Sequence, residues 1–118
     1  MNFKGKIGEL IGRRYLESKK YHILARNYRS RYGEIDVVCQ RESTVIVFCE
    51  IKHYKKNSMV SSLMYINNYQ KKKILHTANL YIQEFQDSHN VKDISYRFDI
   101  LLIEDGYVKQ HIENVNYF

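Results

Sequence analysis

Apolar side chains recur at helical spacing in two stretches of the chain. In the first stretch they lie three or four positions apart, at Ile7, Leu10, Ile11 and Tyr15. This spacing predicts an amphipathic helix from residue 4 to about residue 19, ended by the basic pair Lys19-Lys20. A second, longer helix is predicted from about Val60 to Phe85, with apolar positions at Ile74, Ala78, Tyr81 and Phe85. We expect a loop over residues 87–90 to follow it.

The remaining apolar stretches have the composition of β-strands. Three lie at residues 21–28, 33–40 and 44–52, and two follow the second helix at residues 94–103 and 107–112. The link at residues 41–43 is short enough to join its two strands as an antiparallel hairpin, and the polar residues 53–58 are predicted to form a mobile loop. Residues 94–103 are almost wholly apolar, as in a strand covered on both faces. This order of elements predicts an α/β domain with a mixed five-stranded sheet flanked by helices.

Length and composition limit the class of protein. The 118 residues suffice for one layered domain spanning residues 1–118. No apolar stretch approaches the roughly 20 residues of a membrane span, and the polar start does not lead into a signal-peptide core, so we expect a cytoplasmic protein without a membrane partner. Cys39 and Cys49 lie in predicted strands without zinc-site spacing. We interpret them as buried reduced thiols, with a disulfide as the alternative.

Acidic side chains stand near the ends of two neighbouring predicted strands. Successive side chains of a strand point to opposite faces, so Glu50 and Lys52 share one face of their strand. Glu34 and Asp36 share a face of the preceding strand for the same reason. The hairpin would set Asp36 opposite or diagonal to Glu50, with roughly 5–8 Å between their Cβ atoms. One divalent cation can bridge that separation, which predicts a metal site suited to phosphodiester hydrolysis.

The chemistry of these residues supports that interpretation. Mg²⁺ prefers oxygen ligands and is commonly held by one or two carboxylates, so Asp36 and Glu50 are an adequate set, and the carbonyl of Ile51 can add a ligand. Lys52 would hold or deprotonate the attacking water, or stabilise charge on the phosphate. The alternative is an ordinary salt bridge between Glu50 and Lys52, with Asp36 as a surface acid near a turn.

Other ionisable residues have competing interpretations. Glu34 is a secondary ligand candidate, or else the partner of Arg29 or Arg31. Asp99 lies in an apolar stretch, where an unpaired charge is costly to bury, so we expect an ion pair or hydrogen bonds, with Arg97 as one candidate partner. We assign no role to the scattered histidines His53, His76, His89 and His111.

Several short motifs occur in order along nearly the whole chain. They are Gly8-Glu9, Asn27-Tyr28-Arg29, Gly33-Glu34-Ile35-Asp36, Val47-Phe48-Cys49-Glu50-Ile51-Lys52 and Arg97-Phe98-Asp99-Ile100. In these motifs the chain resembles the YraN family of bacterial proteins, which is assigned to the restriction-endonuclease-like superfamily. The resemblance implies a restriction-endonuclease-like core. It also implies that Asp36 and Glu50 hold Mg²⁺ or Mn²⁺ and that Lys52 assists the attacking water.

The resemblance adds an acid from the first helix. In the resolvase-like branch of the superfamily a glutamate on that helix completes the site, and Glu9 matches its position. Gly12 lies one turn further along, and its missing side chain would let the helix approach the sheet and aim Glu9 at the metal. A solvated acid on the helix face is the alternative. The candidate catalytic residues are thus Asp36, Glu50, Lys52 and Glu9, and the candidate metal ligands are Asp36, Glu50 and Glu9.

The charge balance favours a polyanionic partner. Nineteen Lys and Arg residues against 13 Asp and Glu give a net charge of +6, and nucleic acid is the first candidate. Candidate phosphate contacts are Arg26, Arg29, Arg31, Lys55, Lys56, Lys71, Lys72 and Lys73. A solvated charged face is the alternative for any one of them. The sequence contains no recognition helix or base-reading motif, so structure-directed binding of branched or single-stranded DNA is favoured over sequence reading.

Two functions therefore remain open from the sequence. The first is a Mg²⁺-dependent, structure-directed DNA endonuclease, which on paired strands would act as a homodimer. The second is a nucleic-acid-binding protein that keeps the nuclease fold without turnover and acts with a DNA-processing partner. Loss of the carboxylates would abolish the first function and spare the second.

Overall fold

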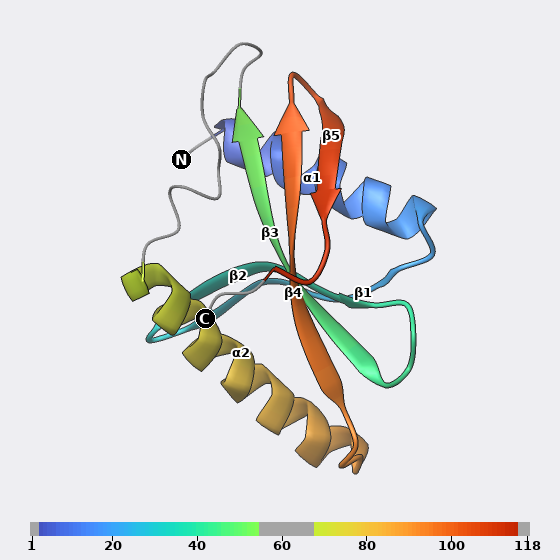
Figure 1. The fold of residues 1–118 in the computed structure, drawn as a ribbon, viewed down its shortest axis with the longest axis vertical. Coiled ribbons are helices and arrows are strands. Elements are labelled where there is room, and N and C mark those ends of the chain that lie inside the picture. Colours follow the sequence, from blue (N-terminus) through green and yellow to red (C-terminus); the bar gives the residue numbers. More distant parts are fainter. Residues whose placement is uncertain (1–2, 55–67, 116–118) are drawn as a thin grey trace.

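The computed structural model describes residues 3–54 and 68–115, whose helices and strands follow the predicted order (Figure 1). The elements are α1 (Phe3–Ser18), β1 (His22–Ser30), β2 (Gly33–Gln40), β3 (Val45–Tyr54), α2 (Asn68–His89), β4 (Ser95–Glu104) and β5 (Tyr107–Ile112). Neither described helix is long and apolar enough to cross a membrane.

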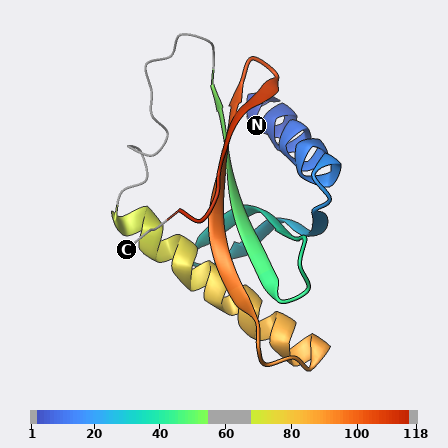
Figure 2. The ribbon, with the colours of Figure 1, turned by 45° about the vertical axis from the view of Figure 1, so that its right-hand side comes forward.

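The strands form one mixed sheet in the order β1-β2-β3-β4-β5. β3 and β4 pair in parallel, and the other neighbours pair antiparallel, which confirms the predicted hairpin of β2 and β3. The chain returns from β3 to β4 through the segment that contains α2, because parallel neighbours require a crossover connection. Figure 2 shows the sheet between α1 on one face and α2 on the other. This architecture confirms the predicted α/β class and is consistent with a restriction-endonuclease-like fold.

Two hydrophobic cores hold the helices against the sheet. Under α2, Phe85 packs in a cluster with Phe98 of β4, and under α1, Leu16 packs in a second cluster. Alternate residues of β4 contribute to both, since Ile100 belongs to the α2 cluster and Leu101 to the α1 cluster. The prediction that this strand is covered on both faces is therefore confirmed.

The cysteines are part of the core beneath α1. Cys39 and Cys49 are both buried and free, which confirms the prediction of reduced thiols. Burial raises the pKa of the Cys39 thiol to about 12 and that of Cys49 well above its ordinary value. Because the thiolate is the reactive form, both side chains serve packing rather than nucleophilic chemistry.

Two predicted loops differ from the structure. His53 and Tyr54 belong to β3, because its parallel pairing with β4 continues to Tyr54 and Glu104, and residues 55–58 of that predicted loop lie outside the described residues. Residues 87–89 continue α2 instead of ending it. The helix ends at His89, and the next residue, Asn90, has a φ of 52°, the left-handed conformation common just after helix C-termini. The predicted helix start at residues 60–67 lies outside the described residues.

Asp99 is buried and fully bonded, as predicted. Arg97 donates from Nε to Asp99 Oδ1 at 3.0 Å and from Nη2 to Asp99 Oδ2 at 3.1 Å. The backbone N–H of Asn114 donates to Oδ1 at 3.0 Å, and Nε2 of His111 lies 2.8 Å from Oδ2. The Nδ1 atom of His111 in turn lies 3.1 Å from the hydroxyl of Tyr15 on α1. His111, to which the sequence assigned no role, therefore links α1 to the buried acid.

Candidate metal centre

β2 and β3 pair over a short stretch and part at the candidate acids. Their backbone pairing runs from Cys39 opposite Val47 to Val37 opposite Cys49. One position further along β2, Oδ2 of Asp36 accepts a hydrogen bond from the backbone N–H of Ile51 at 2.8 Å. The Asp36 carboxylate is thereby held against β3 at the point where the two strands separate.

An open groove of about 350 Å³ lies over these strand ends. It is lined by Gly33, Glu34, Asp36, Glu50, Lys52, Lys73 and Ile74. Both predicted same-face pairs, Glu34 with Asp36 and Glu50 with Lys52, open into this one groove. Lys73 and Ile74 form its wall on the side of α2. The side chains that strand parity placed on shared faces therefore also lie together in the structure.

Glu9 reaches the same acids from α1 because two glycines let that helix sit directly on β3. A Cβ atom on Gly12 would lie 2.6 Å from Cδ1 of Ile51, and one on Gly8 would lie 2.9 Å from Cβ of His53. Real Cβ atoms essentially never come so close to other heavy atoms. The close approach expected at Gly12 is confirmed, and Gly8 extends it toward the start of the helix.

The carboxylates of Glu9, Glu34 and Asp36 converge. One oxygen from each lies within 4.8 Å of the others, so the three can share one metal ion. Asn27 on β1 holds two of them: with its amide nitrogen turned toward the acids, it donates to Glu9 Oε1 at 3.1 Å and to Glu34 Oε1 at 2.9 Å. Glu34 also pairs with Arg29, its cross-strand neighbour, with 3.4 Å between Oε2 and Nε. Of the two interpretations of Glu34, the ion pair with Arg29 is therefore present, and the carboxylate also lies where it could serve as a metal ligand.

Burial, together with the crowding of like charges, raises the pKa values of two acids of the site. Burial, then a hydrogen bond with Asp36 and its negative charge, raises the pKa of Glu50 well above its usual value, against the opposing charge of Lys52. Burial and the charge of Asp36 also raise the pKa of Glu9, although the Asn27 amide opposes this shift. A bound cation stabilises ionised carboxylates and would relieve this repulsion.

The predicted phosphate contacts lie on two sides of the groove. Those on β1 and the turn after it are exposed: Arg26, Arg29 and Arg31. Residues 71–73 lie in the first turns of α2, where Lys73 lines the groove and Lys72 is exposed. Lys55 and Lys56 lie outside the described residues. The β1–β2 turn and the start of α2 therefore frame the acids with positive charge.

Sequence reasoning gave no role to Asn27. It stands at a φ of 50°, a left-handed conformation that Asn adopts more readily than most residues. Such a residue interrupts the simple alternation of side chains along β1, so strand parity does not predict that its amide faces Glu9 and Glu34. The available signal was its place in the Asn27-Tyr28-Arg29 motif.

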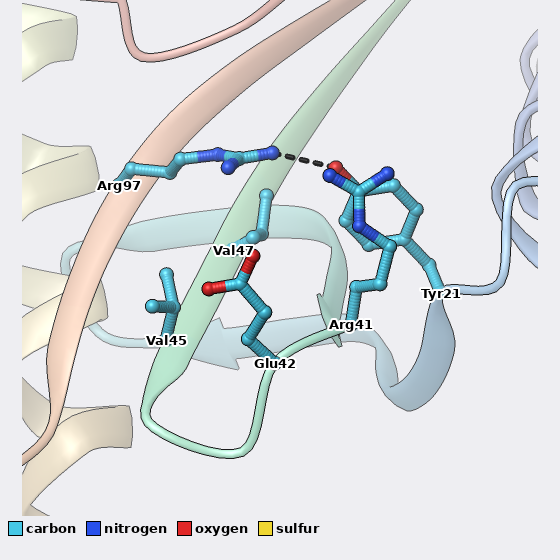
Figure 3. A pocket seen from close by; sticks show the side chains of 6 residues that line it. All are labelled: Tyr21, Arg41, Glu42, Val45, Val47 and Arg97. Atoms are coloured by element: carbon cyan, nitrogen blue, oxygen red, sulfur yellow. Dashed lines mark hydrogen bonds between the residues drawn. The ribbon is translucent and has the colours of Figure 1, made fainter.

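A second hollow is too small to compete as a site. It measures about 10 Å³ and is lined by Tyr21, Arg41, Glu42, Val45, Val47 and Arg97 (Figure 3). That volume admits no more than about one water molecule. Figure 3 also shows Arg97 donating to the Tyr21 hydroxyl, at 2.6 Å, across this hollow.

Fold and site together define the class: an α/β domain with restriction-endonuclease-like architecture, whose carboxylates and a lysine gather at the ends of adjacent strands. Residues 8–103 match the family described as Uncharacterised protein family UPF0102, and the chain belongs to this family. This match confirms the resemblance to the YraN family, which is the same family. The matched residues include Glu9, Asp36, Glu50 and Lys52.

Relatives from several bacteria cover most of the chain. The UPF0102 protein of Sulfurihydrogenibium sp. (strain YO3AOP1) is 37% identical over 111 residues, which are 94% of this chain and 91% of the relative. The UPF0102 protein of Vibrio parahaemolyticus is 31% identical over 98 residues, 83% of this chain and 78% of its own. That of Campylobacter fetus subsp. fetus is 31% identical over 110 residues, 93% of this chain and 90% of its own.

Proposed function

We propose that this protein is a Mg²⁺-dependent DNA endonuclease, resolvase-like in its use of an acid from α1. The observation that carries the proposal is the convergence of Glu9, Glu34 and Asp36, whose ligand oxygens lie within 4.8 Å of one another. Glu50 and Lys52 line the same groove as Asp36. Grouped carboxylates beside a lysine, in an open groove framed by basic residues, suit the hydrolysis of a polyanionic phosphodiester.

The donor set fits Mg²⁺ or Mn²⁺, because both ions favour oxygen ligands. Asp36, Glu50 and Glu9 would hold the ion, with Glu34 as a further ligand. Burial is the main cause of the raised pKa values of Glu50 and Glu9, and the negative charge of Asp36 adds to it. A cation between these carboxylates would relieve the part that comes from charge repulsion. When bound, a divalent cation would activate a ligated water and stabilise charge on the phosphate.

The residues around the acids have separate tasks. Lys52 would orient the attacking water or stabilise the phosphate from the same groove. Lys73, on the α2 side, would bind a phosphate oxygen of the substrate strand. Asn27 orients Glu9 and Glu34, and the backbone N–H of Ile51 fixes Asp36, as partners of metal ligands commonly do.

The proposed substrate is branched or single-stranded DNA. The two described helices, α1 and α2, pack along the sheet (Figure 2), and neither of them projects as a helix free to enter a major groove. Binding would therefore rest on phosphate contacts and on the shape of the nucleic acid rather than on base sequence. On paired strands a homodimer would supply the second active site.

One observation favours the alternative of a binding protein without turnover. The acids already have protein partners, since Asn27 donates to Glu9 and Glu34 and Arg29 pairs with Glu34. Such pairing stabilises the carboxylates without a metal. In that case the groove and its basic rim would bind nucleic acid alongside a DNA-processing partner.

Cleavage of a panel of labelled DNA substrates separates the two functions. Purified protein is incubated with Mg²⁺, Mn²⁺ or EDTA and with junction, flap, single-stranded and duplex DNA, alongside Asp36→Ala and Glu50→Ala. Glu17→Ala, an exposed acid of α1 away from the groove, is the matched control.

The endonuclease predicts metal-dependent cleavage that both groove variants lose and that Glu17→Ala keeps. Equal cleavage by all four proteins would identify a contaminating nuclease and leave the proposal without support. Salt-sensitive binding without cleavage, unchanged in Asp36→Ala, would instead establish the binding protein.

A further inference from the structure

A stack of polar rings stands beside the groove, where the β1–β2 turn meets α2. Tyr32 and His76 stack with 4.8 Å between ring centroids and 26° between ring planes. The guanidinium carbon of Arg31 lies 4.9 Å from the centroid of the Tyr32 ring. Nη2 of Arg31 also donates a hydrogen bond to the Tyr32 hydroxyl at 2.7 Å. Arg31 and His76 are both exposed. We call Arg31, Tyr32 and His76 the stacking column.

The stacking column is held in place by hydrogen bonds beneath it. The backbone N–H of Tyr32 donates to Ser30 Oγ at 3.0 Å, and Ser30 Oγ lies 2.8 Å from Thr77 Oγ1. The Thr77 hydroxyl in turn donates to the carbonyl of Lys73 at 3.0 Å. These bonds attach the turn to α2, so the rings are positioned before any ligand arrives.

The stacking column is adjacent to the acid groove on both of its elements. Gly33, which follows Tyr32 directly, lines the groove. Lys73 also lines it and lies three residues before His76, about 4.5 Å along the helix axis and on the same side of α2. A ligand with an anion in the groove and a flat ring one helical turn away can therefore contact both.

Core packing does not account for these rings. Neither Tyr32 nor His76 belongs to the two hydrophobic clusters of the described residues. Rings and a guanidinium next to phosphate-binding lysines are the surface on which unpaired bases stack. Bases within a continuous duplex have no free face to offer to such a surface.

We infer that the stacking column is a platform for an unpaired nucleobase of the strand whose phosphate lies in the groove. The inference rests on the proposed function and narrows its substrate to single-stranded DNA, or to the unpaired nucleotides beside a branch point. His76 offers its exposed ring to the base, Tyr32 supports that ring, and Arg31 adds positive charge.

Binding to strands with and without bases tests this inference. A labelled single-stranded oligonucleotide and an abasic strand of equal length are titrated in EDTA, which prevents cleavage, with wild type, His76→Ala and Tyr32→Phe. Tyr107→Ala, which removes an exposed ring from β5, is the matched control. Circular dichroism verifies that each variant is folded.

The platform predicts that wild type binds the base-bearing strand about tenfold or more tightly than the abasic strand. His76→Ala should lose most of that preference with unchanged affinity for the abasic strand, while Tyr32→Phe and Tyr107→Ala keep it. Equal binding of both strands by wild type, or an unchanged preference in His76→Ala, would overturn the inference. Base-dependent binding without metal-dependent cleavage would reject the endonuclease and support the stacking column as a base platform. Metal-dependent cleavage with base-independent binding would support the endonuclease and reject the platform.

Discussion

Oδ2 of Asp36 accepts a hydrogen bond from the backbone N–H of Ile51 at 2.8 Å, just beyond the last backbone pair of β2 and β3. The Asp36 side chain thus takes the place of a backbone partner for β3, and β2 and β3 separate at this point. Glu9 of α1 reaches the opening from one face, and Lys73 of α2 lines the groove on the other. Residues from both helix layers of the fold therefore meet beside this contact.

Replacement of Asp36 should separate its structural role from its chemical role. Asp36→Asn keeps an oxygen that can accept from Ile51, so we expect the free energy of unfolding to change by less than about 0.5 kcal/mol. Asp36→Ala leaves the N–H of Ile51 without its acceptor and should destabilise the fold by about 1–3 kcal/mol. Urea unfolding in EDTA measures both. Equal destabilisation by the two variants would show that this hydrogen bond contributes nothing to stability.

Glu50→Gln should stabilise the metal-free protein at alkaline pH. Because the folded-state pKa of Glu50 is raised, folding favours its protonated form, and the wild type loses stability as pH rises through that value. The amide has no charge to repel Asp36. We expect the variant to be more stable than wild type at pH 8 and about equal below pH 4, measured by denaturant midpoints in EDTA. A difference that does not depend on pH would contradict this account of Glu50.

Asp99 should make stability depend on acid pH in the opposite sense. Burial alone would raise its pKa, but hydrogen bonds from His111, Arg97 and Asn114 outweigh burial and lower it. The stabilisation is therefore present above the ordinary aspartate pKa of about 3.9 and is lost as pH falls through the lower folded-state value.

Asp99→Asn removes the buried charge that Arg97 pairs with and should cost about 3 kcal/mol at pH 7. The variant and wild type should converge in stability as the pH is lowered to about 2, as followed by thermal unfolding. The exposed Asp93→Asn is the control and should match wild type throughout. A constant gap between Asp99→Asn and wild type at every pH would show that the carboxylate charge is not the cause.

Lys73→Gln should weaken DNA binding through one lost phosphate contact. The salt dependence of binding, as the slope of log K against log salt, should become shallower by about 1. Lys92→Gln, an exposed lysine beyond the far end of α2, carries the same change of charge and should leave the slope unchanged. Fluorescence anisotropy at several salt concentrations provides both slopes. An equal change in the two variants would indicate a general charge effect rather than a contact in the groove.

Two features of the site could be predicted from short stretches of sequence, the grouping of the strand acids and the close approach of α1. Strand parity and the short hairpin link predicted that Asp36 and Glu50 lie near each other, because alternation along a strand and pairing across a short turn need no knowledge of the rest of the fold. The small residue Gly12 predicted the close approach of α1 for a similar reason, since only the space beside one backbone position was in question.

Contacts between distant elements could not be predicted in this way. The role of Asn27 depends on a left-handed backbone within β1, and the buried partnership of His111 with Asp99 depends on how β5 pairs with β4. Tyr32 and His76 meet only because the β1–β2 turn docks on α2. No pattern within a single element encodes these contacts.

Direct measurement of metal binding tests the central claim, that the converging carboxylates form a divalent-cation site. Mn²⁺ is titrated calorimetrically into wild type, Asp36→Asn and the control Asp93→Asn without nucleic acid. We predict saturable binding to wild type and to Asp93→Asn, and binding at least about tenfold weaker to Asp36→Asn, because the variant keeps the fold but loses a charged ligand. Equal binding by wild type and Asp36→Asn, or no saturable binding to wild type, would contradict the claim.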